Sequence, residues 1–137
     1  MLHNIQVTTF DMNRLFAMIE QLRKSGFRET ANLEKLEEEL ARSDEVAPSE
    51  VAADVVTMNS RVRLQDEASG QTLECNLVFP GEADASANRI SIVAPLGTAI
   101  LGYRVGDTVT WPMPGGERQY KIVEIVYQPE AAGDLHL

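Results

Sequence analysis

The first side chains to consider as a general base or a nucleophile in this 137-residue chain are its two histidines and its one cysteine. His3 and His136 lie close to the ends of the sequence, where chains are least ordered, so neither is expected to be a positioned base. Cys75 lies in the strand-like run LECNLVF with no histidine nearby in sequence, and such a thiol usually packs as a small apolar side chain. The pattern predicts no catalytic residue.

Metal and phosphate sites need characteristic ligand spacings, which this sequence does not show. It has no CxxC or HExxH motif, no EF-hand loop, no P-loop and no GxGxxG. The run LEKLEEEL is dense in carboxylates, but such runs usually form the solvated face of a helix, with partner docking as the other interpretation. We therefore expect no metal and no other cofactor, and a binding protein rather than an enzyme.

The charge balance restricts the partners. Lys and Arg number 12 against 21 Asp and Glu, so the net charge of −9 opposes binding to phosphate backbones. Direct nucleic-acid binding is not expected, whereas a basic protein surface would be a favourable partner. No apolar run is long enough for a membrane span, the N-terminus lacks the basic region of a secretory signal, and the single cysteine fits the cytoplasm.

The first third of the chain predicts two amphipathic helices. Thr8 or Thr9 can cap the first, and Asp11 in its first turn suits the positive end of the helix dipole. The second runs over about 29–42, and the turn KSGFRE between them predicts an antiparallel hairpin. Apolar residues recur at helical spacing at Met12, Leu15, Met18 or Ile19, and Leu22, and then at Leu33, Leu36 and Leu40.

Beyond an acidic, proline-containing segment the periodicity changes from 3.6 to 2. Pro95 suits the first turn of a short helix, and Gly102 suits its exit. The predicted fold class is α+β, with a helical hairpin at 1–47, a linker at 48–54 and a mostly antiparallel sheet with one short helix at 55–137. Strands are predicted at 55–64, 72–79, 89–93, 107–111 and 120–127.

The block ISIVAPLGTAILGYRVGDTVTW, followed by GERQYKIVEIVY, resembles the C-terminal domain of the bacterial Gre transcript-cleavage factors. The stretches DVVTMNSRVRL and YQPEAAGDL look like the Gre-related regulators of nucleoside diphosphate kinase, the Rnk family. Together these resemblances cover nearly the whole chain. The residues at matching places are Ile90, Ser91, Pro95, Leu96, Gly97, Ala99, Gly102, Gly106, Asp107, Gly115, Ile125 and Tyr127.

The resemblance implies an FKBP-like sheet domain preceded by an antiparallel coiled coil, with RNA polymerase as the partner. Gre-family proteins dock the sheet domain at the rim of the polymerase secondary channel and insert the coiled coil into the channel. Carried over by position, the docking loop is Val93, Ala94 and Pro95, with Leu96 adjacent. Pro95 matches the acid-Ser-Pro element of the cleavage factors, whereas Val93 and Ala94 replace its acid and its serine.

The resemblance also bears on transcript cleavage, for which Gre factors hold Mg²⁺ with two acids at the tip of a long coiled coil. The corresponding tip is RKSGFRET, where Glu29 lies among Arg23, Lys24 and Arg28. The first helix, of about 17 residues, would extend roughly 25 Å, about half the length of a Gre hairpin helix. We therefore expect a non-cleaving relative, with an active cleavage factor as the alternative. The basic tip would either contact acidic surface in the channel or be an ordinary solvated loop.

Two further interpretations belong to other classes. A prolyl isomerase of the FKBP type would need an aromatic-lined pocket, although aromatic residues at strand positions more often fill the core. The name of the Rnk family raises direct regulation of nucleoside diphosphate kinase, for which no contact residues stand out in the sequence. The aromatic residues of the sheet domain are Phe79, Tyr103, Trp111, Tyr120 and Tyr127.

Overall fold

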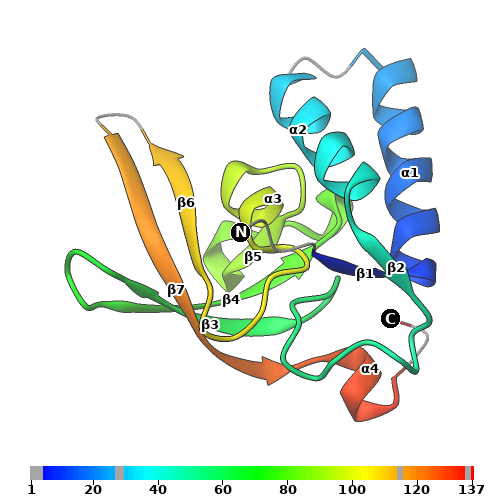
Figure 1. Ribbon diagram of the computed structural model, residues 1–137. Coiled ribbons are helices and arrows are strands. Elements are labelled where there is room, and N and C mark those ends of the chain that lie inside the picture. The colour runs from blue at the N-terminus through cyan, green and yellow to red at the C-terminus, as the bar shows by residue number, and fades with distance from the viewer. Residues whose placement is uncertain (1–4, 27–29, 114–115, 135–136) are drawn as a thin grey trace.

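The computed structural model describes residues 5–26, 30–113, 116–134 and 137. In chain order its elements are β1 (Gln6–Thr8), α1 (Thr9–Lys24), α2 (Thr30–Ala41), β2 (Asp44–Val46), β3 (Arg61–Asp66), β4 (Thr72–Val78), the short 3₁₀ helices η1 (Pro80–Glu82) and η2 (Ala85–Ala87), β5 (Arg89–Ser91), α3 (Pro95–Ile100), β6 (Thr108–Met113), β7 (Gly116–Tyr127) and α4 (Pro129–Ala132). Helices α1 and α2 lie side by side, and α3 lies between α2 and the sheet (Figure 1). This arrangement confirms the predicted α+β class, while the FKBP-like and coiled-coil descriptions stay predictions.

The first helix forms where the sequence predicts it. The Thr8 side chain accepts a hydrogen bond from the backbone nitrogen of Asp11 at 3.0 Å, which satisfies one of the free donors of the first turn. The apolar stripes of both helices face inward and pack against the rest of the fold, with Met18 and Leu22 only partly buried. Their buried apolar residues are Met12, Leu15 and Ile19 in α1 and Leu33, Leu36 and Leu40 in α2.

A small parallel pair of strands links the N-terminal end of α1 to the C-terminal end of α2. The sequence analysis missed this pair. Strand β1 precedes α1 directly and pairs with β2, which follows α2, in the register Gln6↔Asp44 to Thr8↔Val46. The pair is short, but Val7 is 1% exposed and anchors it in the core. Strands of only three residues are too short to show an alternation that can be recognised in a sequence.

The main sheet has the strand order β5-β4-β3-β7-β6. Every neighbouring pair is antiparallel except β4 and β5, which run parallel and are connected through η1 and η2. A mostly antiparallel sheet is therefore confirmed. Among the described residues, no helix combines the length and the apolar character that crossing a membrane requires.

The predicted strand at 55–64 is wrong in its first half, because β3 begins only at Arg61. Polar side chains provide the backbone there with an alternative to the sheet. The Ser60 hydroxyl accepts from the backbone nitrogen of Thr57 at 2.9 Å, and Asn59 takes the left-handed conformation with φ 66°. The segment forms a buried turn, with Val56 bonded to the backbone of Tyr103 and Gly102 instead of a neighbouring strand.

The chain after β7 folds back onto the turn before β3. The Gln128 side chain caps α4 and donates two hydrogen bonds of 2.8 Å, to the carbonyl oxygens of Ala52 and Val55. The hydroxyl of Tyr127 donates to Asp134. Strand β7 is also longer than the predicted 120–127, since it begins at Gly116.

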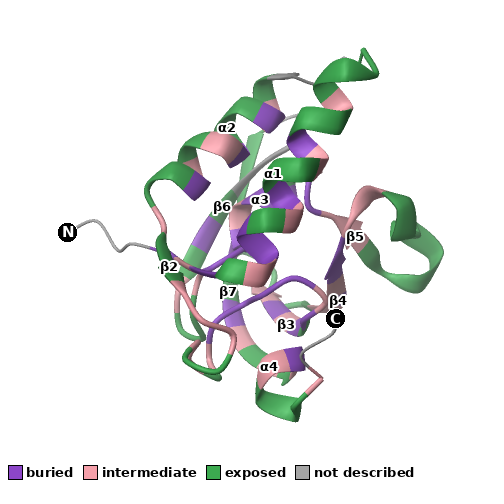
Figure 2. Ribbon diagram, turned by 90° about the vertical axis from the view of Figure 1, so that its right-hand side faces the viewer, coloured by how far each residue is buried: buried purple, intermediate pink, exposed green. Residues whose placement is uncertain are grey.

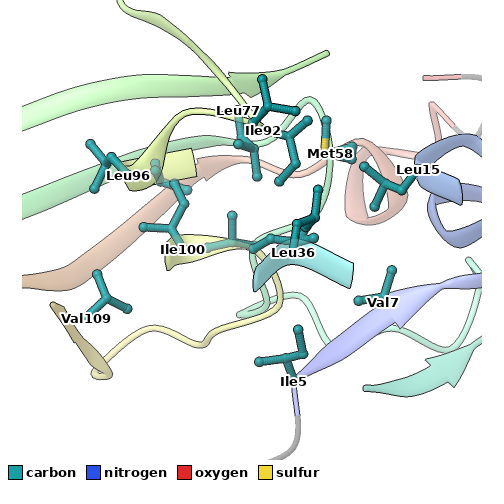
Figure 3. Close-up of a cluster of buried hydrophobic side chains, with 14 of the residues drawn as sticks. Ile5, Val7, Leu15, Leu36, Met58, Leu77, Ile92, Leu96, Ile100 and Val109 are labelled. Carbon is teal, nitrogen blue, oxygen red and sulfur yellow. The ribbon is translucent and has the colours of Figure 1, made fainter. Parts of the chain in front are cut away.

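One hydrophobic core joins the helices to the sheet. The buried residues, purple in Figure 2, gather where α1, α2, α3 and the sheet meet. Leu15 of α1, Leu36 of α2, Ile100 of α3 and Leu77 of β4 belong to the same cluster, as Figure 3 shows. Residues before and after the segment 48–54 therefore share one core. The division into domains at that segment stays a prediction.

Candidate functional site

The turn between β5 and α3, together with the first two residues of α3, contains the four residues that the sequence singles out for docking. The chain turns sharply after Ser91, whose carbonyl oxygen accepts from the backbone nitrogen of Ala94 at 3.0 Å and whose hydroxyl accepts from that of Val93 at 3.2 Å. Pro95 then opens α3, a position that suits its fixed φ and missing N–H. We call residues 92–96, which comprise this turn and the first two residues of α3, the β5–α3 loop.

Only two of the four predicted docking residues in the β5–α3 loop are accessible to solvent. Val93 is 8% exposed and Leu96 is 2% exposed, so both pack into the core. Pro95 is exposed and Ala94 is half-buried. A partner could touch Pro95 and Ala94 directly, whereas Val93 and Leu96 could only support their position. The docking role of the four residues stays a prediction.

Gly97 holds α3 tightly against the end of β5, and the sequence analysis noted it only as part of a motif. A β-carbon at this position would lie 2.1 Å from the carbonyl oxygen of Ser91 and 3.0 Å from the Cα of Ile92, which is far inside van der Waals contact. The close approach therefore needs a residue without a side chain. It sets the shape of the β5–α3 loop.

The second helix also contacts this loop, through a residue that the sequence analysis did not select. The side-chain amide of Asn32 donates hydrogen bonds to the carbonyl oxygen of Val93 and, at 2.9 Å, to the hydroxyl of Thr98. A polar residue beside Leu33 gives no signal in the sequence, because it is equally suited to the solvated side of an amphipathic helix.

The basic residues at the tip of the helical pair are partly neutralised. Both terminal nitrogens of the Arg23 guanidinium donate to the carboxylate of Glu37, at 2.9 and 2.7 Å, and this hydrogen bond lowers the pKa of Glu37. Lys24 pairs with Glu20 at 3.1 Å. Arg28 and Glu29 lie outside the described residues. Within the described ranges, no group of three or more His, Cys, Asp and Glu side chains is arranged to hold a metal ion.

The base of α1 contains an ion pair in which the carboxylate is buried and the guanidinium is partly exposed. Asp11 is 0% exposed, pairs with the Arg14 guanidinium at 2.6 Å and accepts from the backbone nitrogen of Met58 at 3.0 Å. The Arg14 guanidinium lies 3.9 Å from the ring centre of Phe10 and 4.9 Å from that of Phe79. This cluster fixes α1 to the turn before β3.

The Asp11 carboxyl predicts a pH dependence of stability. Burial raises its pKa above the ordinary 3.8, and the hydrogen bonds from Met58 and Arg14 offset only part of that rise. Its contribution to stability is therefore complete below the unfolded-state pKa and is lost as the pH rises through the higher folded-state pKa. We expect the free energy of unfolding of the wild type, relative to Asp11→Asn, to decrease as the pH rises above about 4. Urea unfolding at a series of pH values measures it, and a constant difference would contradict the prediction.

The remaining candidates for chemistry are Cys75 and the aromatic side chains, and their environments fit roles in the structure. Burial raises the pKa of Cys75 to about 12, so the thiol stays protonated at neutral pH. Of the five aromatic residues of the sheet domain, Phe79 contacts Arg14, Tyr103 packs against the core, Tyr120 is buried in the core and Tyr127 bonds to Asp134, while the Trp111 side chain lies outside the described part of the chain. These placements agree with core and surface roles for the aromatic residues.

Comparison with known proteins identifies the family. Residues 51–127 match the family described as "Transcription elongation factor, GreA/GreB, C-term", and residues 3–46 match the one described as "Rnk N-terminus". The "Regulator of nucleoside diphosphate kinase" of Escherichia coli strain K12 is 38% identical over 97% of this chain and 96% of its own length. The chain belongs to the Rnk family. The resemblance seen in the sequence is thereby confirmed.

The chain is also similar to proteins named as Gre-type transcription factors. The "Transcription inhibitor protein Gfh1" of Thermus aquaticus is 34% identical over 109 residues, which are 78% of this chain and 68% of that protein. Among solved structures, the "Prokaryotic transcription elongation factor GreA/GreB" from Nitrosomonas europaea has a TM-score of 0.76 and 41% identity, covering 90% of this chain and 100% of that one. The Rnk fold described above is therefore that of the Gre-type proteins.

Proposed function

We propose that this Rnk-family protein is a transcription regulator that binds RNA polymerase at the rim of the secondary channel and does not cleave transcripts. The observation that carries the proposal is that Pro95, which the sequence resemblance aligns with the Gre docking element, is exposed at the start of α3. The likeness to proteins named transcription elongation factor and transcription inhibitor supports it. Such a partner places the protein in the cytoplasm.

The rigidity of the loop supports a docking role. A loop held in one conformation loses little entropy when it binds, so more of the contact energy appears as affinity. Here the turn is fixed by hydrogen bonds to Ser91, by the buried side chains of Val93 and Leu96, and by the close approach of Gly97. Pro95 adds a side chain that is itself conformationally restricted.

The geometry of the helical pair supports the absence of cleavage. Helix α1 has 16 residues, which corresponds to a length of about 24 Å. The described part of its tip is basic, and Arg23 is engaged with Glu37. A short, basic tip is poorly suited to carry a divalent cation to a distant active centre, because Mg²⁺ prefers carboxylate oxygens. Occupying the channel would let the protein compete with longer, cleaving factors.

Replacing Pro95 tests the docking. The variant Pro95→Asp should fold normally, because an acidic residue is favourable in the first turn of a helix. It should bind core RNA polymerase at least about tenfold more weakly, since it places a charge in an apolar contact. Fluorescence anisotropy or surface plasmon resonance with purified core enzyme measures this loss.

The matched control is Pro48→Asp, which introduces the same charge at a half-buried proline outside the loop. It should bind the polymerase as the wild type does. Equal affinity of wild type and Pro95→Asp would remove the loop from the interface. Binding to purified nucleoside diphosphate kinase with none to the polymerase would instead favour the kinase as direct partner.

A further inference from the structure

The side chain of Asn32 in α2 hydrogen-bonds to the β5–α3 loop. It projects from the first turns of α2, and both protons of its amide are used: one goes to the carbonyl oxygen of Val93, the other to the hydroxyl of Thr98. These acceptors flank Pro95 on its two sides in the chain. The contact thus encloses the exposed part of the loop.

Thr98 extends this contact into the sheet domain. Its hydroxyl accepts from Asn32 and donates to the carbonyl oxygen of Ile92 at 2.7 Å, and the residue is 3% exposed. A chain of hydrogen bonds therefore runs from α2 through α3 to the end of β5. The neighbouring contacts of Leu33 and Leu36 are apolar and would permit small sliding movements, whereas directional hydrogen bonds do not.

We propose that Asn32 is a positioning residue that fixes the helical pair relative to the docking loop, so that docking of the loop sets the direction of the helices. The proposal rests on the proposed function. It follows from the geometry, because rotation of α2 away from α3 would leave the buried hydroxyl of Thr98 and the carbonyl oxygen of Val93 without the Asn32 donor. The loop and the helices then act as one rigid unit.

The substitution Asn32→Asp tests the requirement for the two donors. It preserves the shape of the side chain but presents carboxylate oxygens to Val93 and Thr98. We expect about tenfold weaker binding to core RNA polymerase and faster amide hydrogen exchange across the β5–α3 loop, measured where the variant is fully folded. The matched control is Asn13→Asp, the same change at an exposed asparagine of α1, which should leave both readouts unchanged.

A double-mutant cycle with Pro95→Asp separates positioning from a general loss of stability. If Asn32 acts through the loop, the two losses of affinity will be clearly less than additive. Additive losses, or an Asn32→Asp variant that binds like Asn13→Asp while the wild type binds well, would overturn this inference and leave the proposed function standing. Failure of the wild type to bind polymerase would contradict both the proposed function and the inference about Asn32.

Discussion

The variant Gly97→Ala is expected to unfold at a temperature lower by about 10 °C, corresponding to a loss of about 3 kcal/mol in the free energy of unfolding. Its β-carbon would lie 2.1 Å from the carbonyl oxygen of Ser91, and that oxygen belongs to the backbone. No change of rotamer can relieve such a contact. Helix α3 must therefore move away from β5, which disturbs Leu96 and Ile100 in the core.

The natural control is Gly81→Ala, because a β-carbon at Gly81 meets nothing within 4 Å. Its melting temperature should differ from that of the wild type by no more than about 2 °C. Thermal unfolding followed by circular dichroism provides both values. A Gly97→Ala variant as stable as Gly81→Ala would show that α3 does not pack on β5 as closely as described. Residual folded Gly97→Ala should also bind polymerase weakly, since the loop shape is altered.

The second large effect is expected for Asp11→Ala, which should lose about 2–3 kcal/mol of stability. The change removes the acceptor of the buried backbone nitrogen of Met58. It also leaves the Arg14 guanidinium beside Phe10 without its carboxylate. The loss falls mainly on the buried Met58 nitrogen, because Arg14 is 28% exposed and also donates to the carbonyl oxygen of Leu137 at 2.9 Å.

Urea unfolding measures this loss, with two further variants as controls. Asp54→Ala removes an exposed carboxylate that lies 3.6 Å from Arg104, so it should change stability by less than about 0.5 kcal/mol. Asp11→Asn keeps an acceptor for Met58 and should lose less than Asp11→Ala does. If Asp11→Ala unfolded at the same urea concentration as Asp54→Ala, the buried carboxylate would contribute nothing to the attachment of α1.

The helices could be predicted from the sequence because their signals are local. The cap at Thr8 and the recurring leucines of α2 depend on residues three or four positions apart. The strand edges were harder, since the run at 55–60 is apolar enough for a strand. Its conformation is decided by the Ser60 hydroxyl and by contacts with the distant Gly102 and Tyr103.

The candidate site could be predicted by position but not by orientation. The resemblance singles out Pro95, which is exposed at the start of α3, yet the sequence does not say which side chains of SIVAPLG point inward, and Val93 and Leu96 are buried. Contacts between segments far apart in the chain could not be predicted from the sequence either. Asn32 meets a loop 61 residues away, and Arg23 meets Glu37 across the helical pair. Such pairings depend on the packing of complete elements.

Displacement of a fluorescently labelled Gre cleavage factor from a stalled RNA polymerase elongation complex is the most direct measurement, with transcript cleavage recorded in the same sample. We expect the wild type to displace the label and to suppress cleavage as it is titrated, to produce no cleavage when added alone with Mg²⁺, and to lose both effects in Pro95→Asp. Retention of the label at saturating protein would contradict docking at the channel rim. Transcript cleavage by the protein alone would contradict the proposal of a non-cleaving regulator.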